Sequence, residues 1–277
     1  MRGTTGTAWI GAAVLAGTLT ATSCGAERTA ETRAVQGQAP AAPTPTPSPT
    51  PPPPRRIDCA KEKCVALTFD DGPGPYTEGL LDDLRRAGAR ATFFMLGQNV
   101  GEFPQTVRRM ALEGHELANH SWSHPMLTNL STSAVKSQVQ RTQDAIRRAS
   151  GVTPTLFRPP YGATDKRVAK AVALPEILWS VDTLDWRHRN VSRVRKSGVG
   201  EPRKGGIVLF HDIHESTVKA VPEVVAGLKR KGFTPVTVSE LYGDTPPEAG
   251  RSYLERVEPQ QTPPPVEYDR ETSTAQG

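Results

Sequence analysis

Two adjacent carboxylates, Asp70 and Asp71, are the first residues in the chain whose types and spacing suggest chemistry. They end the apolar run 65–69, and Gly72 and Pro73 then break the chain. This pattern is typical of a buried strand that delivers both carboxylates to its carboxyl end, where strand twist can bring them into one cleft. Two carboxylates this close repel each other unless a cation binds one of them or they share a proton. Taken alone, the pattern fits a solvated turn equally well.

Two histidines four residues apart, His120 and His124, follow a second strand-like run at 115–118. Histidines at this spacing can bind one metal ion, although alone they are more often structural or surface residues. In a parallel α/β fold the carboxyl ends of the strands share one edge, where active sites form. One aspartate and two histidines would provide three ligands and an open fourth position, which is the pattern of catalytic zinc.

Three more polar clusters also follow strand-like runs. They lie in the segments 157–162, 181–186 and 208–212. Each cluster alone predicts no more than a rigid turn with a solvated polar side chain. Five such clusters in order, each at the end of a strand-like run, together predict an active site.

Strand-like and helix-like patterns alternate from residue 57 to about residue 242. This alternation predicts parallel strands with helices outside them, in either a barrel or an open sheet. About 185 residues is short for an eightfold barrel, so any barrel must be truncated or irregular. The expected strands are 65–69, 91–96, 115–118, 155–157, 177–181, 206–210 and 234–238, and the expected helices are 76–87, 104–113, 131–150, 165–173 and 218–231.

With these clusters in view, the chain resembles the polysaccharide deacetylases of the NodB-homology type, carbohydrate esterase family 4. All five family motifs are matched across residues 64–242, and no catalytic position is substituted. The resemblance implies an α/β fold in the form of a distorted, incomplete (β/α) barrel. The matching motifs are Thr68–Pro73, His120–His124, Arg158–Gly162, Asp182–Trp186 and Leu209–Asp212.

The resemblance also implies a divalent metal, usually zinc with cobalt as the alternative, held by Asp71, His120 and His124. It implies that Asp70 is the general base and that Arg158 holds it. This assignment makes chemical sense because metal binding lowers the pKa of water towards neutrality, and a carboxylate can then take the proton. A guanidinium beside Asp70 is expected to keep that carboxylate ionised.

On the leaving-group side, the resemblance implies that His211 is the general acid and that Asp185 orients it. A leaving amine must be protonated, and a histidine is a suitable donor near neutral pH. The resemblance further implies that the backbone N–H of Tyr161 binds the oxyanion. Trp186 and Leu209 are expected to form the walls of a small pocket for the acetyl methyl group.

The first 24 residues resemble an export signal, with Arg2 followed by the apolar stretch 8–19. This stretch is too short for a comfortable membrane span. Residues 21–24 resemble a lipobox that ends in Cys24, although Ala21 stands where leucine is usual. An ordinary secretory signal is the alternative. Either reading predicts an extracytoplasmic protein, as a membrane lipoprotein or in secreted form.

The segment 25–56 is rich in proline, alanine and threonine, so we expect a disordered, extended linker before the catalytic domain at 57–242. The polar, proline-rich segment 243–277 is expected to be a disordered tail. Cys59 and Cys64 are closely spaced in an exported chain, which favours one disulfide between them. They could instead bind a metal, but the sequence has no second pair to complete such a site.

The charge balance differs between the expected domain and the expected tail. Residues 57–242 hold 26 basic and 20 acidic residues, whereas residues 243–277 hold three basic and seven acidic ones. A basic exported domain suits a polyanionic surface such as the cell envelope. Export and the lack of interleaved aromatic residues argue against nucleic acid as a partner. Most of the charges are expected to lie on solvated faces of helices. The protein is expected to be a monomer.

These observations together predict a hydrolase that removes acetyl groups from N-acetylglucosamine units of a cell-envelope polysaccharide. Peptidoglycan is the first expected substrate and chitin oligomers are the second. An O-acetyl esterase acting on xylan through the same site is one alternative. A non-catalytic carbohydrate-binding lipoprotein is another, although the loss of a motif residue would favour it and none is lost.

Overall fold

The computed structural model describes residues 50–257. The predicted export signal, Cys24, most of the expected linker and residues 258–277 lie outside this part of the chain. Within 50–257, no helix combines the length and apolar character needed to cross a membrane.

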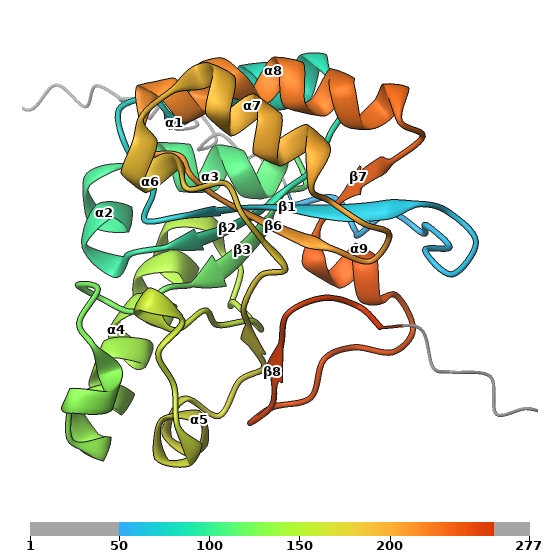
Figure 1. The fold of residues 1–277 in the computed structure, drawn as a ribbon. Helices are drawn as coiled ribbons and strands as arrows, with labels where there is room; N and C mark the ends of the chain where they lie inside the picture. The colour runs from blue at the N-terminus through green and yellow to red at the C-terminus, as the bar shows by residue number, and fades with distance from the viewer. Residues whose placement is uncertain (1–49, 258–277) are drawn as a thin grey trace, which may run out of the picture. The chain divides into compact units, whose positions relative to one another are not determined.

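A parallel sheet organises the described part of the chain, with β1 at its centre (Figure 1). The strands follow the order β3-β2-β1-β6-β5, and β7 also pairs with the start of β1. This sheet therefore assembles segments far apart in the sequence around β1. The strands are β1 Cys64–Asp70, β2 Thr92–Met95, β3 Glu116–Asn119, β4 Glu176–Ile177, β5 Val181–Asp182, β6 Ile207–His211, β7 Thr234–Val236 and β8 Ser252–Tyr253.

Beyond β3, the sheet curls but is joined only by single bridges. Phe157 bridges Asn119 on one side and Glu176 on the other, and β4 then pairs with β8. Gly206, just before β6, bridges Glu255. The result is an open, distorted barrel, which confirms the expected fold class. The strand expected at 155–157 is reduced to one bridge, and the one expected at 177–181 is divided between β4 and β5.

Helices cover the sheet, with α1, α3, α7 and α8 above it in Figure 1 and α9 below it. The expected helices are present, whereas α2, α6, α7 and α9 were not expected from the sequence. Ser131 caps the start of α4 by accepting a hydrogen bond from Ala134 N, and Gly151 ends it at a φ of 77°. The helices are α1 Thr77–Arg86, α2 Gly97–Glu102, α3 Pro104–Leu112, α4 Thr132–Ser150, α5 Lys166–Val172, α6 Asp185–His188, α7 Val191–Gly200, α8 Glu215–Arg230 and α9 Val238–Tyr242.

The alternation of side chains along β1 separates the core from the site. Val65, Leu67 and Phe69 pack into the core beneath the upper helices. Thr68 and Asp70 point to the opposite face, because successive strand residues alternate. Asp70 therefore enters the site on a strand whose other face is anchored by apolar packing.

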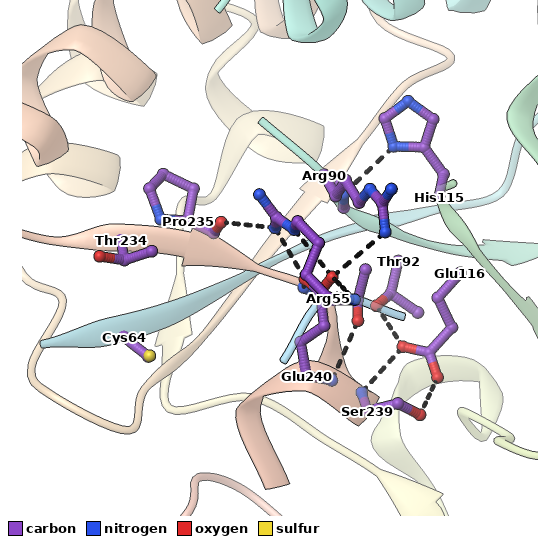
Figure 2. Close-up of polar contacts among 12 residues, drawn as sticks. Arg55, Cys64, Arg90, Thr92, His115, Glu116, Thr234, Pro235, Ser239 and Glu240 are labelled. Atoms are coloured by element: carbon purple, nitrogen blue, oxygen red, sulfur yellow. Dashed lines mark hydrogen bonds and ion pairs between the residues drawn. The ribbon is translucent and has the colours of Figure 1, made fainter. Parts of the chain in front are cut away.

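The segment 50–56, which was expected to be disordered, instead packs at the end of the sheet where the strands begin. Figure 2 shows Arg55 beside Glu240 of α9, with Nε and Nη2 of the guanidinium 2.8 and 2.7 Å from the two carboxylate oxygens. Arg90 lies 3.5 Å from the same carboxylate and donates to Pro53 O at 3.2 Å. A cavity of about 260 Å³ at this end is lined by Pro51, Pro54 and His115, among others.

Each end of the domain is also held in place by contacts of its own. The disulfide between Cys59 and Cys64 is present and lies just before β1. Residues 243–257, which were expected to be disordered, continue along the domain, where β8 pairs with β4 and Tyr242 Oη donates to Glu255 O at 2.9 Å. The compact unit therefore extends past both expected boundaries, because these short segments find backbone and side-chain partners on it.

Candidate active site

Asp70 and Asp71 leave the end of β1 in different ways. Asp70 is the last strand residue and pairs in register with His211 of β6. Asp71 has a φ of 71°, so the strand alternation stops there. Its backbone N–H donates to Phe94 O at 3.2 Å, and Asn99 Nδ2 donates to Asp71 O at 2.7 Å. The left-handed backbone of Asp71, held by these bonds, brings both carboxylates to the same site. From the sequence we had expected strand twist to bring them together.

Asp71, His120 and His124 form a group that could hold a metal ion, with one ligand atom from each residue and all within 4.8 Å of one another. Asp71 Oδ1 lies 3.6 Å from Nε2 of each histidine. This oxygen is buried and accepts no hydrogen bond from the residues that the structure describes. A buried acceptor without a donor is costly unless a cation takes that place.

The protonation of His120 also suits metal binding. Its Nδ1 lies 2.7 Å from Arg158 O, and because a carbonyl can only accept, Nδ1 carries the hydrogen. The lone pair of Nε2 then faces the Asp71 carboxylate. Burial lowers the pKa of His120 to about 3, so the ring is neutral. The three side chains thus fit a divalent cation with an open position.

Asp70 and Arg158 form a buried ion pair next to this group. Arg158 Nη1 donates to Asp70 Oδ1 at 2.6 Å, and both side chains are almost wholly buried. The guanidinium also donates to Thr68 Oγ1, Ile177 O and Leu178 O. Burial raises the pKa of Asp70, whereas the charge and hydrogen bond of Arg158 lower it. Arg158 thus reduces the rise in the pKa of Asp70 but does not cancel it. From the sequence we had expected the guanidinium to have a larger effect.

His211 faces Asp70 across the two central strands and is held by Asp185. His211 Nδ1 lies 2.8 Å from Asp185 Oδ1, and Asp185 Oδ2 accepts the His211 N–H and the Thr217 hydroxyl, each at 2.7 Å. Burial works to lower the pKa of His211, but the Asp185 hydrogen bond and nearby carboxylate charges outweigh it and raise the pKa to about 9. The imidazolium is therefore stable at neutral pH, and its Nε2–H is not engaged by Asp185.

The three residues expected around the acetyl group differ in exposure. Tyr161, with a φ of 61°, is 62% exposed, and its ring lies 4.4 Å from that of His124, centroid to centroid. Leu209 is buried on β6, on the same face as His211. Trp186 is 47% exposed, and its indole donates to Asp182 Oδ2 at 3.4 Å.

Sequence reasoning assigned no role to two further polar residues at this edge. Thr217 lies outside every motif, and no pattern in the sequence indicated its bond to Asp185. Asp212 lies within a quoted motif and is fully buried, and burial raises its pKa to about 7. It accepts a hydrogen bond from Thr77, and a Cβ added at Gly72 would lie 2.3 Å from its carboxylate oxygens. Only glycine fits there, so Asp212 supports the loop that carries Asp71.

A candidate cation site, a buried carboxylate and a histidine whose pKa is raised, all at one sheet edge, would together suit the hydrolysis of an acyl group. Comparison with known proteins identifies the family. A family model described as polysaccharide deacetylase matches residues 57–176. A peptidoglycan-N-acetylglucosamine deacetylase of Bacillus cereus is 34% identical over 186 residues, which cover 64% of this chain and 68% of that protein. The chain belongs to the polysaccharide deacetylase family.

Two other relatives extend this result. The peptidoglycan-N-acetylglucosamine deacetylase PgdA of Listeria monocytogenes is 45% identical over 197 residues, which cover 71% of this chain and 42% of PgdA. The chain thus spans about two fifths of the length of that deacetylase. Among solved structures, a family 4 acetyl xylan esterase from Clostridium thermocellum in complex with cobalt is 32% identical with a TM-score of 0.67, covering 70% of this chain and 98% of that one.

Proposed function

We propose that this polysaccharide deacetylase removes acetyl groups from N-acetylglucosamine units of a cell-envelope polysaccharide and releases acetate. Peptidoglycan is the first proposed substrate, and chitin oligomers are the second. The observation that carries the proposal is the meeting of Asp71, His120 and His124 with the Asp70–Arg158 pair and with His211 at one sheet edge. The two peptidoglycan deacetylases described above support peptidoglycan as the substrate.

Asp71, His120 and His124 are proposed to hold the metal. The oxygen and nitrogen donors suit zinc, and the cobalt in the related esterase makes cobalt the alternative. Such a cation supplies Lewis acidity, which polarises an acetyl carbonyl and lowers the pKa of water. The hydrogen bond from His120 Nδ1 to Arg158 O fixes the orientation of that ring.

Asp70 is proposed as the general base and His211 as the general acid. Asp70 takes a proton from the attacking water, and Arg158 holds its carboxylate in place. His211 then gives the proton on Nε2 to the nitrogen of the amide, so that the sugar amine departs uncharged. Asp185 binds Nδ1 of the same ring and keeps the imidazolium aligned.

The remaining residues are proposed to position the acetyl group. The backbone N–H of Tyr161 donates to the developing oxyanion, and such a donor stabilises charge that appears only in the transition state. Leu209 and Trp186 contact the acetyl methyl group. The partly exposed indole of Trp186 also leaves room for a polymer to enter.

One specific observation favours a second candidate, an O-acetyl esterase that acts on xylan. The related acetyl xylan esterase shares the fold over 70% of this chain. The same residues could cleave an ester, which needs less help from His211 because an alkoxide is a better leaving group than the anion of an unprotonated amine. A non-catalytic carbohydrate-binding protein receives no such support, since every expected motif residue is present.

One experiment compares these functions directly. Acetate release should be measured from purified peptidoglycan, chitin oligomers and acetylated xylan at matched acetyl concentrations. The highest kcat/KM is expected on peptidoglycan and the next on chitin oligomers. A preference for xylan would replace the amidase proposal with the esterase. Release from none of the three would contradict an enzymatic function.

The N-terminal proposals concern where the enzyme works. We propose an extracytoplasmic monomer that is either secreted or anchored through lipid on Cys24, with residues 1–24 as the signal and a linker before the catalytic domain. A labelled fatty acid should be incorporated into the wild-type protein, and Cys24→Ser should release it into the medium. Equal release of both forms would leave secretion as the explanation.

A further inference from the structure

Three arginines without acidic partners follow closely in sequence on Asp185, the residue that binds the proposed general acid. Arg187, Arg189 and Arg193 are exposed and occur within seven residues, on α6 and the start of α7. None of the three lies within 4.0 Å of a carboxylate of the described residues. Many other surface arginines have such a partner, as in the pairs Arg85–Asp82, Arg86–Asp83, Arg109–Glu113, Arg147–Asp144 and Arg195–Glu223.

The position of Arg189 connects this cluster to the catalytic edge. Its Nε donates to Trp186 O at 2.8 Å, and its Nη1 contacts His214 Nδ1. The His214 ring lies 5.8 Å from the His211 ring, centroid to centroid. Arg189 is therefore separated from the proposed general acid by a single imidazole ring.

The backbone conformation of Arg189 is unusual for a residue that carries a side chain. Arg189 ends α6 at a φ of 48°, in the left-handed region that favours glycine. A non-glycine residue there is strained, and strained residues cluster at binding sites. The side chain is thus present at a position where backbone conformation alone would select against it.

The nearby acids make contacts with other residues, and within residues 50–257 none forms an ion pair with the three arginines. Asp182 accepts hydrogen bonds from Leu184 N and the Trp186 indole. Asp185 is bound to His211, and Glu215 pairs with Lys219. The Arg193 guanidinium contacts only the ring of His188, at 3.2 Å, and the Arg187 side chain makes no hydrogen bond or ion pair within residues 50–257. The guanidinium groups of Arg187 and Arg193, together with Nη2 of Arg189, thus remain available to an anion.

We propose that Arg187, Arg189 and Arg193 form an anion subsite for carboxylates carried on the glycan next to the reacting sugar. The inference rests on the proposed deacetylase function and deepens it by selecting an acidic glycan over a neutral one. Guanidinium groups bind carboxylates through two parallel hydrogen bonds. The peptide side chains of peptidoglycan carry such carboxylates, whereas chitin and xylan backbones do not.

The test uses two glycans that differ only in charge. One is a soluble peptidoglycan fragment with free peptide carboxylates, and the other is the same fragment with those carboxylates converted to methylamides. The variant is Arg187→Gln with Arg193→Gln. The control is Arg148→Gln with Arg230→Gln, which removes the same charge from the exposed last turns of α4 and α8.

Wild type and control should prefer the free-carboxylate fragment, with a kcat/KM roughly fivefold higher at low ionic strength and a preference that fades as salt is added. Arg187→Gln with Arg193→Gln should lose most of this preference, whereas lysine at both positions should retain its salt dependence. An unchanged preference in the glutamine variant, or no preference in wild type, would overturn the subsite.

Binding of the same two fragments, measured by calorimetry, separates this inference from the proposed function. If wild type releases no acetate from either fragment, the deacetylase function fails. The ratio of the two dissociation constants still decides the subsite in that case. A ratio near one in wild type, or one that the glutamine variant leaves intact, counts against it. Thermal unfolding of each variant confirms that it is folded.

Discussion

The two ends of the central sheet bury acidic side chains in opposite ways. Where the strands begin, Glu240 accepts hydrogen bonds on both carboxylate oxygens, from Arg55 and from Thr237 N. Glu116 is likewise bonded through both of its oxygens. Where the strands end, Asp71 and Asp212 each keep one buried oxygen that accepts no hydrogen bond from residues 50–257.

This difference distinguishes acids that hold the fold together from acids that are free to bind something. A buried carboxylate with a complete set of donors has no capacity left for a ligand. Glu113 is an exception away from the catalytic edge, since its Oε2 accepts no hydrogen bond and lies 3.8 Å from His115 Nε2. A single unpaired oxygen is thus weak evidence, and the catalytic edge differs because its acids converge with histidines.

The largest expected effect is on turnover at the catalytic edge. Asp70→Asn should lower kcat by about 100- to 10,000-fold, because it removes the proposed base, while the protein keeps its metal. Asp71→Ala should lose both turnover and metal. Metal content by elemental analysis and acetate release on the same samples would test this. Equal metal binding by both variants and wild type would mean that the two carboxylates are assigned wrongly.

His211→Ala separates the roles of acid and base. Its effect on amide turnover should also reach about 100-fold or more, because an amine cannot leave without a proton. The loss on an aryl acetate should be much smaller, since an aryloxide departs unaided. Both substrates should be assayed with both proteins. Equal losses would remove His211 from the general-acid role.

A change at the opposite end should alter stability and leave catalysis intact. Glu240→Ala leaves Arg55 partly buried without its partner, and the free energy of unfolding should fall by about 3–5 kcal/mol if the pair behaves as a buried one. Because Arg55 is 30% exposed, the lower part of that range is expected. Denaturant unfolding measures the loss, and kcat per folded molecule should match wild type. A fall in kcat without a loss of stability would contradict the comparison.

The smallest effect is a shift in the pH profile. As the proposed general acid, His211 acts in its protonated form, so the rate should fall on the alkaline side as pH rises through its pKa of about 9. Asp185→Asn removes the charge that raises this pKa. The alkaline limb should therefore move to lower pH by about one to two units. Glu240→Gln is the matched control, and the alkaline limb of its pH–rate profile should coincide with that of wild type. An unmoved limb in Asp185→Asn would show that Asp185 does not tune His211.

The same comparison explains what the sequence could predict. The proposed catalytic residues occur in short clusters that follow apolar runs, as in Leu67–Gly72 and Val208–Asp212. Because parallel strands end at one edge, order along the chain was enough to group them. The fold class, the bounds of α4 and the Cys59–Cys64 disulfide followed from similarly local signals.

Contacts between distant residues could not be predicted in this way. Arg55 and Glu240 are 185 positions apart, and nothing near either residue indicates the other. Thr217 reaches Asp185 over 32 positions, also without a motif. Proline-rich composition predicted disorder for 50–56, but composition does not reveal a partner on the folded domain. The left-handed backbone at Asp71 likewise depends on the hydrogen bond that its N–H donates to Phe94 O and on the one that its carbonyl accepts from Asn99 Nδ2.

The most direct test of the account is a metal titration of the proposed deacetylase. Protein stripped with a chelator should release no acetate from an N-acetylglucosamine oligomer. The rate should rise in proportion to the zinc added, up to one equivalent per chain, because Asp71, His120 and His124 are proposed to form one site. His124→Ala, stripped and titrated in the same way, should not recover. Full acetate release by the metal-free wild-type protein would contradict the central claim.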